Sequence, residues 1–195
     1  MATPKLTPTS YVVLGLVASA GRCTPYDLKR LVAQSVGHFW SFPHAQLYAE
    51  PARLAAMGLL TEEREAGGRN RRHYAVTAAG RAAVRAWLAT PETGLGEIRD
   101  PGLLKLFFAE IGTPEDVAGL AAAQRDAHRE RLRIYERLAA DLGQLPGSDL
   151  RVAPLEMGLR FERMAVAFWA DIANRAAGAA RQPGKRRRRA AMTSR

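Results

Sequence analysis

The feature that most constrains this chain is a glycine- and arginine-rich turn between two short strand-like segments. The segments span residues 59–63 and 73–76, and Gly67-Gly68-Arg69-Asn70-Arg71-Arg72 lies between them. Two strands joined by such a turn form a β-hairpin, and glycine at the tip tolerates the positive φ of a tight turn. The three arginines would repel one another unless an anion lay beside them. The sequence therefore predicts a hairpin whose basic tip contacts a polyanion.

Three helical segments precede the hairpin. Thr7-Pro8 and Thr24-Pro25 each combine an N-capping residue with proline at the first helical position. The first helix is expected to end at Gly21, the second near Val36, and a third to run from Ser41 to Met57. Three short helices followed by a hairpin are the elements of a winged helix-turn-helix, whose third helix enters the DNA major groove.

The distribution of charge indicates which part of the chain binds the polyanion. The 195 residues have a formal net charge of +10. Lys and Arg outnumber Asp and Glu by 11 to 5 in residues 1–90 and by 7 to 0 in residues 179–195, but not in residues 91–178, where they count 11 against 14. We expect a DNA-binding domain (1–90), a helical dimerisation domain (91–178) and a basic, disordered tail (179–195) that adds non-specific attraction for phosphates.

Other classes of protein are not indicated. Cys23 is the single cysteine, so neither an intramolecular disulfide nor a Cys-rich zinc site can form. The histidines lack the spacing of metal ligands, and no nucleophile, carboxylate pair or phosphate-binding loop stands out, so we expect no cofactor, no metal and no enzymatic activity. The apolar run over residues 11–18 is too short to cross a membrane, and no secretion signal precedes it. A cytoplasmic protein without a membrane partner is expected.

The second half is predicted to be entirely helical. Residues 99–111 are apolar almost all round and are expected to form a buried helix, which a long helix from Pro114 to Leu142 follows. The segment from Val152 to about Ala177 carries two apolar stripes. They consist of Met157, Phe161, Met164, Phe168 and Ile172, and of Leu155, Leu159, Val166 and Trp169. One stripe can pack on the chain's own helices, but the second needs another surface, so we expect a twofold homodimer.

Several short motifs follow one another in the first half. They are Gln46-Leu47-Tyr48, Arg53-Leu54, Met57-Gly58-Leu59-Leu60, Gly68-Arg69-Asn70-Arg71-Arg72, Tyr74, Val76-Thr77, Gly80-Arg81 and Trp87-Leu88. Together they resemble the PadR family of bacterial transcriptional regulators, and a looser similarity continues at residues 155–159 and Trp169. The resemblance implies a mainly α protein, with a winged helix-turn-helix N-terminal domain and an all-helical C-terminal dimerisation domain. Pro51 departs from the family pattern, and a kink near Leu47–Pro51 or a late helix start is expected there.

The predicted DNA-binding residues lie on the second helix, the third helix and the hairpin. They are Thr24, Tyr26, Lys29, Ser41, His44, Gln46, Tyr48, Arg53, Arg69, Asn70, Arg71 and Arg72. The second helix and the hairpin are expected to lie near phosphates. Two alternatives stay open, because the third-helix side chains could merely cover the edge of the core, and Arg53 is equally suited to an ion pair with Glu50.

The sequence thus predicts a sequence-specific transcriptional regulator that binds double-stranded DNA, acting as a homodimeric repressor on a palindromic operator. Some PadR-like dimers bind aromatic effectors between their subunits. A small-molecule effector that releases the DNA is therefore a further expectation, with Trp87 and Trp169 as candidate residues. The alternative is a basic protein that compacts DNA without sequence preference, which would explain the charge but not the hairpin after three helices.

Overall fold

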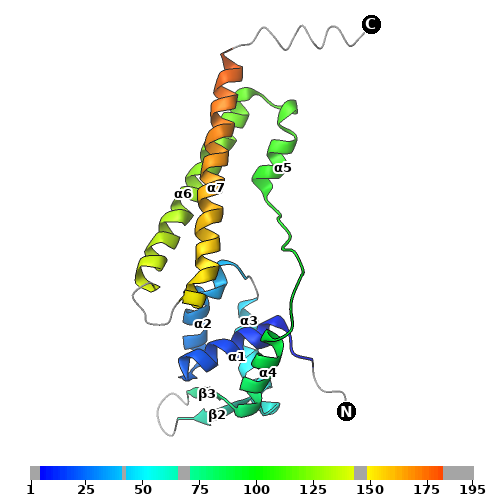
Figure 1. The fold of residues 1–195 in the computed structure, drawn as a ribbon, viewed down its shortest axis with the longest axis vertical. Coiled ribbons are helices and arrows are strands. Elements are labelled where there is room, and N and C mark those ends of the chain that lie inside the picture. The colour runs from blue at the N-terminus through cyan, green and yellow to red at the C-terminus, as the bar shows by residue number, and fades with distance from the viewer. Residues whose placement is uncertain (1–4, 41–42, 66–70, 143–148, 182–195) are drawn as a thin grey trace. The chain divides into compact units, whose positions relative to one another are not determined.

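The computed structural model describes residues 5–40, 43–65, 71–142 and 149–181. The chain divides into two compact units, Met1–Leu95 and Gly96–Arg195. Helices dominate both units, and the described strands form a single sheet in the first (Figure 1). None of the helices in these ranges is long and apolar enough to span a membrane.

The first unit contains helices packed on a small sheet. Its elements in chain order are α1 (Pro8–Ala20), β1 (Arg22–Cys23), α2 (Pro25–Ala33), the 3-10 turn η1 (Val36–His38), α3 (His44–Ala56), β2 (Leu60–Arg64), β3 (Arg72–Val76) and α4 (Ala78–Leu88). The three predicted helices and the predicted hairpin are confirmed. The second helix ends earlier than the predicted Val36, and α3 begins later than the predicted Ser41.

Local sequence sets the helix ends. The Thr7 and Thr24 side chains accept hydrogen bonds from the third backbone N–H of α1 and of α2, and the third side chain of each helix accepts one from the capping residue's N–H in return. These capping boxes satisfy backbone donors that a helix start leaves free. Gly21 and Gly58, which follow α1 and α3, have φ of 82° and 71°, a region that glycine enters without strain.

Helix α3 continues across Pro51. The helix begins at His44, with Pro43 as its N-cap residue. Pro51 is fully buried, as are Leu47 and Leu54 on the same face. Its ring therefore adds apolar surface to the core at the position where the helix loses one backbone hydrogen bond.

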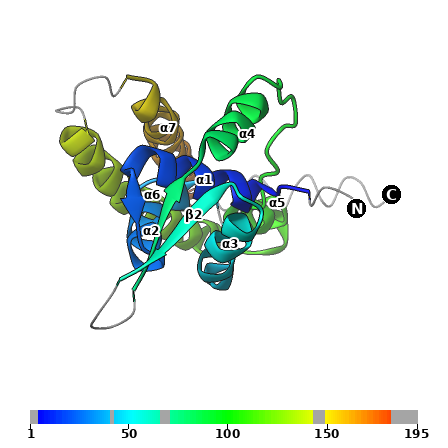
Figure 2. The ribbon, with the colours of Figure 1, turned by 90° about the horizontal axis from the view of Figure 1, so that it is seen from below.

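The strands form an antiparallel sheet in the order β1-β3-β2. Strand β3 pairs with β2 to form the hairpin, with Glu62 opposite Tyr74 and Arg64 opposite Arg72. Figure 2 shows the hairpin in front of α1, with α2 and α3 behind it. Strand β1 was not predicted, because two residues are too few to show the alternation of a strand.

A single apolar core joins the helices and the sheet of the first unit. Its buried residues are Val13, Leu14, Val17, Cys23, Leu28, Val32, Leu47, Leu54, Leu60 and Tyr74. Burial raises the pKa of the Cys23 thiol to about 11, with a smaller contribution from the charge of Asp27. The thiol is therefore protonated at neutral pH, and it serves as a small core residue.

The second unit contains α5 (Pro101–Phe107), the 3-10 turn η2 (Ala109–Ile111), α6 (Pro114–Leu142) and α7 (Asp149–Ala180). Helices α6 and α7 lie side by side along their length (Figure 1). The buried core between them contains Ala121, Ala165, Trp169 and Ile172. The long helix predicted over residues 114–142 is confirmed.

The predicted buried helix over residues 99–111 is wrong for this chain. The observed helix is shorter, and Leu104, Phe107 and Ile111 are 63%, 79% and 83% exposed. Within the described residues, α5 packs against the α6–α7 core through Leu106. A seven-residue helix that presents one side to its own chain leaves its other apolar side chains in solvent.

The two stripes of α7 differ in burial. Leu159 and Trp169 are buried against α6, whereas Met157, Phe161, Met164 and Phe168 are exposed. Ile172, which the sequence assigned to the stripe of Met157 and Phe161, is instead buried, as Leu159 and Trp169 are. The chain therefore has an exposed apolar stripe on α7.

Candidate nucleic-acid interface

The hairpin of β2 and β3, called the wing below, presents cations at the end nearest its turn. The backbone N–H of Glu65 donates to the Arg71 carbonyl at 3.0 Å, so the pairing extends beyond the strands. Arg64, Arg71 and Arg72 are exposed there. The predicted contacts Arg69 and Asn70 lie outside the described residues.

The start of α2 lies beside the wing. A shallow groove of about 620 Å³ separates them, lined by Thr24, Pro25, Tyr26, Asp27, Arg71, Arg72 and His73. The groove combines the N-terminus of a helix with two guanidinium groups, and both attract phosphate. Of the predicted residues, the structure therefore brings Thr24 and Tyr26 together with Arg71 and Arg72.

Asp27, the one carboxylate among the described residues that line this groove, already has hydrogen-bond partners. The backbone N–H and the hydroxyl of Thr24 donate to Asp27 at 3.0 and 2.8 Å. These hydrogen bonds hold the pKa of Asp27 below its usual range, and the one from the Thr24 backbone has the larger effect. Arg30 lies 3.6 Å from the other oxygen of this carboxylate. Asp27 is thus tied to its own helix, while Tyr26 and Lys29 are exposed.

The exposed side of α3 is composed mainly of small residues. Ala45, Ala49 and Ala56 are exposed, and Tyr48 is the large side chain beside them, at 51% exposure. A helix with small side chains can approach the floor of a groove closely. Ser41 lies outside the described residues, as does the side chain of His44, the first residue of α3.

Two of the predicted DNA contacts on α3 also form hydrogen bonds with α1, and their role in DNA binding stays a prediction. Gln46 accepts a hydrogen bond from the Thr9 hydroxyl at 2.9 Å. Arg53 donates to the Ser10 hydroxyl at 2.9 Å and to both oxygens of Glu50, at 2.6 and 2.9 Å. The Glu50 pair is the alternative that the sequence left open for Arg53. The hydrogen bond from Arg53 is the largest of the effects that lower the pKa of Glu50.

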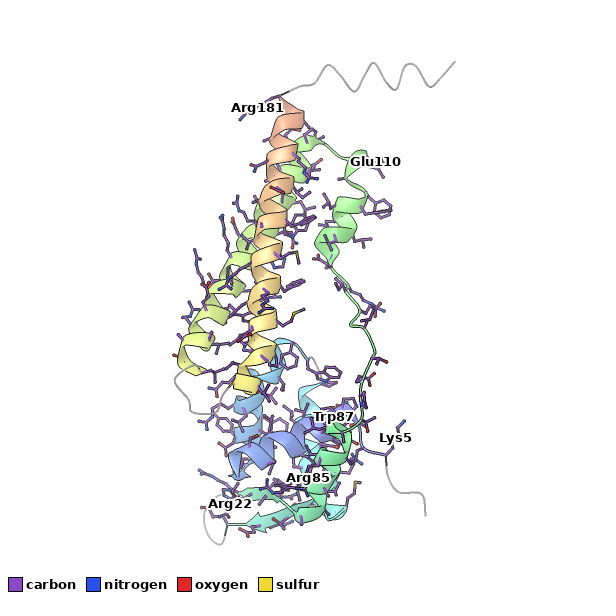
Figure 3. The ribbon with its side chains drawn as sticks, in the orientation of Figure 1. Lys5, Arg22, Arg85, Trp87, Glu110 and Arg181 are labelled. Atoms are coloured by element: carbon purple, nitrogen blue, oxygen red, sulfur yellow. The ribbon has the colours of Figure 1, made fainter. Side chains whose placement is uncertain are left out.

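Residues that the sequence did not single out connect the strands of the sheet. Tyr74 donates its phenolic proton to Glu62 at 3.1 Å, and Arg64 Nε donates to Glu62 at 3.2 Å. On the opposite face, Arg22 of β1 pairs with Glu63 at 3.0 Å (Figure 3 labels Arg22). Writing β2 and β3 in their antiparallel register would have indicated the contact between Glu62 and Tyr74, because these two residues are directly paired.

The two tryptophans considered for an effector lie in different surroundings. Trp169 is fully buried between α6 and α7. Trp87, labelled in Figure 3, stacks on Tyr11 with ring centroids 4.7 Å apart and an angle of 10° between the planes. A groove of about 480 Å³ between α5 and α6 is lined by other residues, among them Lys105, Phe108 and Leu120. The effector role of Trp87 and Trp169 stays a prediction.

Comparison with known proteins gives matches in both halves. Residues 13–86 match the model of the Transcriptional regulator PadR-like family, and residues 98–176 match that of the Virulence activator alpha C-term family. The negative transcriptional regulator PadR of Bacillus subtilis (strain 168) is 26% identical over 136 residues, which cover 67% of this chain and 74% of that protein.

Solved structures share the fold. The crystal structure of Bacillus subtilis PadR in complex with operator DNA matches with a TM-score of 0.78 at 21% identity, covering 87% of this chain and 99% of that chain. The same protein in complex with p-coumaric acid matches with a TM-score of 0.74 at 21% identity, covering 89% and 99%. The expected fold class, a winged helix-turn-helix followed by a helical domain, is thereby confirmed.

Proposed function

We propose that the chain is a PadR-like, DNA-binding transcriptional regulator, and that it acts as a homodimeric repressor that recognises a palindromic operator. The observation that carries the proposal is the groove in which the start of α2 meets Arg71 and Arg72 of the wing. A phosphate in this groove would fix the register of the protein on a duplex, and α3 would then enter the major groove. The Bacillus subtilis relative crystallised with operator DNA supports this reading.

Dimerisation is assigned to the helical domain, residues 91–178, and DNA binding to residues 1–90. The observed boundary between units, after Leu95, supports this division. The exposed stripe on α7, together with Leu104, Phe107 and Ile111, leaves large apolar side chains in solvent. A symmetric copy of the same surface would cover them, and a twofold dimer matches the twofold symmetry of a palindrome. Residues 179–195 are proposed to add non-specific phosphate attraction.

Repression is proposed rather than activation because occupying a promoter requires binding alone. The curated relative is named a negative regulator, which agrees. The structure of that relative with p-coumaric acid supports a small-molecule effector that releases the DNA, and Trp87 and Trp169 stay the candidate residues. We assign the protein no enzymatic activity and place it in the cytoplasm.

Selection of duplexes from a random pool tests the proposal. The full chain is incubated with the pool at a stated salt concentration, and bound duplexes are amplified and sequenced. We expect a palindromic consensus with half-sites roughly 10 base pairs apart. A pool without enrichment would overturn the proposal and favour the alternative, a basic protein that compacts DNA without sequence preference.

A further inference from the structure

Glu62 lies on β2 of the wing, beside two arginines at the end of the strands nearest the turn. The Tyr74 hydroxyl donates to Glu62 Oε2 at 3.1 Å, Arg64 Nε donates to Oε1 at 3.2 Å, and Arg72 Nε lies 3.7 Å from Oε1. The register pairs Glu62 with Tyr74 and Arg64 with Arg72. Because alternate residues of a strand share a face, all four side chains lie on one side of the wing.

Two like charges meet at this position. Arg64 and Arg72 form a direct cross-strand pair, which by itself destabilises a hairpin. Burial would raise the pKa of Glu62, but the hydrogen bonds from Tyr74 and Arg64 and the nearby guanidinium charges outweigh it and lower this pKa. Glu62 is therefore ionised at neutral pH and acts as an acceptor only. One carboxylate thus stands between two cations and leaves the group with a net positive charge.

The group is anchored in the core of the unit. The Tyr74 ring is 1% exposed and packs with the buried residues of the sheet and helices. Its hydroxyl fixes Glu62, and Glu62 in turn holds the two guanidinium groups. The Arg64 and Arg72 side chains are 59% and 49% exposed, and each guanidinium has five N–H donors. Both arginines therefore retain donors for an external anion.

We propose that Glu62 is a positioning residue for DNA binding, which holds Arg64 and Arg72 in the orientation in which they meet the phosphates of the operator. The inference rests on the proposed function. An arginine that is already ordered loses less side-chain entropy when it binds, so positioning favours the complex in which the phosphates match it. The negative charge at the same time weakens attraction to any polyanion. Glu62 thereby raises the ratio of specific to non-specific affinity.

Three variants of the full chain separate positioning from charge. Glu62→Gln removes the carboxylate from the group, and Glu63→Gln removes the same charge from the next residue, which lies on the opposite face and pairs with Arg22. Tyr74→Phe removes the hydroxyl that fixes Glu62 and leaves the net charge unchanged. Fluorescence anisotropy measures binding to the duplex that the wild-type protein selects from the random pool and to a shuffled duplex of equal length, over a series of salt concentrations.

We expect Glu63→Gln to tighten binding to both duplexes by the same factor, so that the ratio of the two affinities does not change. Glu62→Gln should tighten binding to the shuffled duplex only, and the ratio should fall by about tenfold. Tyr74→Phe should also lower the ratio, without changing the slope of log K against log salt. Circular dichroism verifies that each variant folds. If Glu62→Gln does not fold, the affinity ratio of Tyr74→Phe tests the positioning role of Glu62 instead.

Two results would overturn the inference while leaving the proposed function intact. One is an equal ratio for Glu62→Gln and Glu63→Gln, and the other is a wild-type ratio for Tyr74→Phe. A wild-type protein that selects no duplex would instead overturn the proposed function, and the inference with it.

Discussion

Gly80 is a position where one added methyl group should strongly destabilise the first unit. A Cβ built on Gly80 of α4 would lie 2.2 Å from the backbone oxygen of Leu59 and 2.9 Å from a methyl of Val76. Distances this short are strongly repulsive, so either α4 or the turn before β2 must move. Val76 is β-branched and adjusts its side chain poorly. The Leu59 carbonyl accepts a hydrogen bond from the backbone N–H of Thr77 at 3.1 Å. The Thr77 hydroxyl lies 3.1 Å from the same oxygen, but it is closer to the Gly58 carbonyl, at 2.8 Å.

The expected cost of Gly80→Ala follows from these contacts. Overpacking a tight site costs about 1 to 3 kcal/mol. Weakening the hydrogen bond from the Thr77 N–H to the Leu59 carbonyl adds about 1 kcal/mol. The higher helix propensity of alanine, compared with glycine, offsets about 1 kcal/mol of this cost. We therefore expect the free energy of unfolding to fall by about 1 to 3 kcal/mol, with a drop in Tm of roughly 5 to 20 °C.

Gly15→Ala is the matched control. Gly15 lies on α1 of the same unit, and a Cβ built there meets nothing within 4 Å. This variant should gain stability by up to about 1 kcal/mol. Urea and thermal unfolding, followed by circular dichroism at one protein concentration, measure both variants. A Gly80→Ala protein within about 0.5 kcal/mol of the wild type, or an equal loss in Gly15→Ala, would refute the reasoning.

Three further predictions concern DNA binding, assembly and pH. Arg71→Ala should weaken binding to all duplexes and reduce the slope of log K against log salt by about 1. Arg85→Ala, on the exposed surface of α4, should leave the affinity and the slope unchanged. An equal effect of the two variants would contradict phosphate binding in the groove. Met164→Glu places a charge on the exposed stripe of α7 and should give a monomer in light scattering, and a dimer of wild-type affinity would exclude that stripe from the interface. The pKa of Glu50 is lowered in the folded state, so its contribution to stability is present at neutral pH and is lost as the pH falls through the acid range. Because Arg53 is partly exposed, this contribution should be below about 1 kcal/mol. In urea unfolding below the ordinary glutamate pKa, the free energy of unfolding of Glu50→Gln should therefore fall less steeply with decreasing pH than that of the wild type. An unchanged pH profile would show that the pair with Arg53 contributes nothing.

Signals that act within a few residues determined much of the fold from the sequence alone. The capped helix starts at Thr7 and Thr24 lie where the sequence predicts them, because a capping box and a proline at the first position depend only on adjacent residues. The wing could be predicted for the same reason, since its turn composition and strand length are local. Part of the groove was also accessible, as Arg71 and Arg72 were recognised from the charge of the turn.

Contacts between distant segments decided the rest. Gln46 and Arg53 form hydrogen bonds with Thr9 and Ser10 of α1, which lie more than 30 residues away in sequence, so the periodicity of α3 cannot show which of its side chains have partners within the chain. The exposure of α5 has a similar origin, because apolar composition indicates that a surface will be covered but not by which chain. Glu62 became recognisable as a partner of the wing arginines only when the register of β2 and β3 placed Arg64 opposite Arg72. The sequence thus determined most of the helices and the wing, and the tertiary structure determined which of their side chains are buried or hydrogen-bonded, because burial and hydrogen bonding depend on neighbours in space.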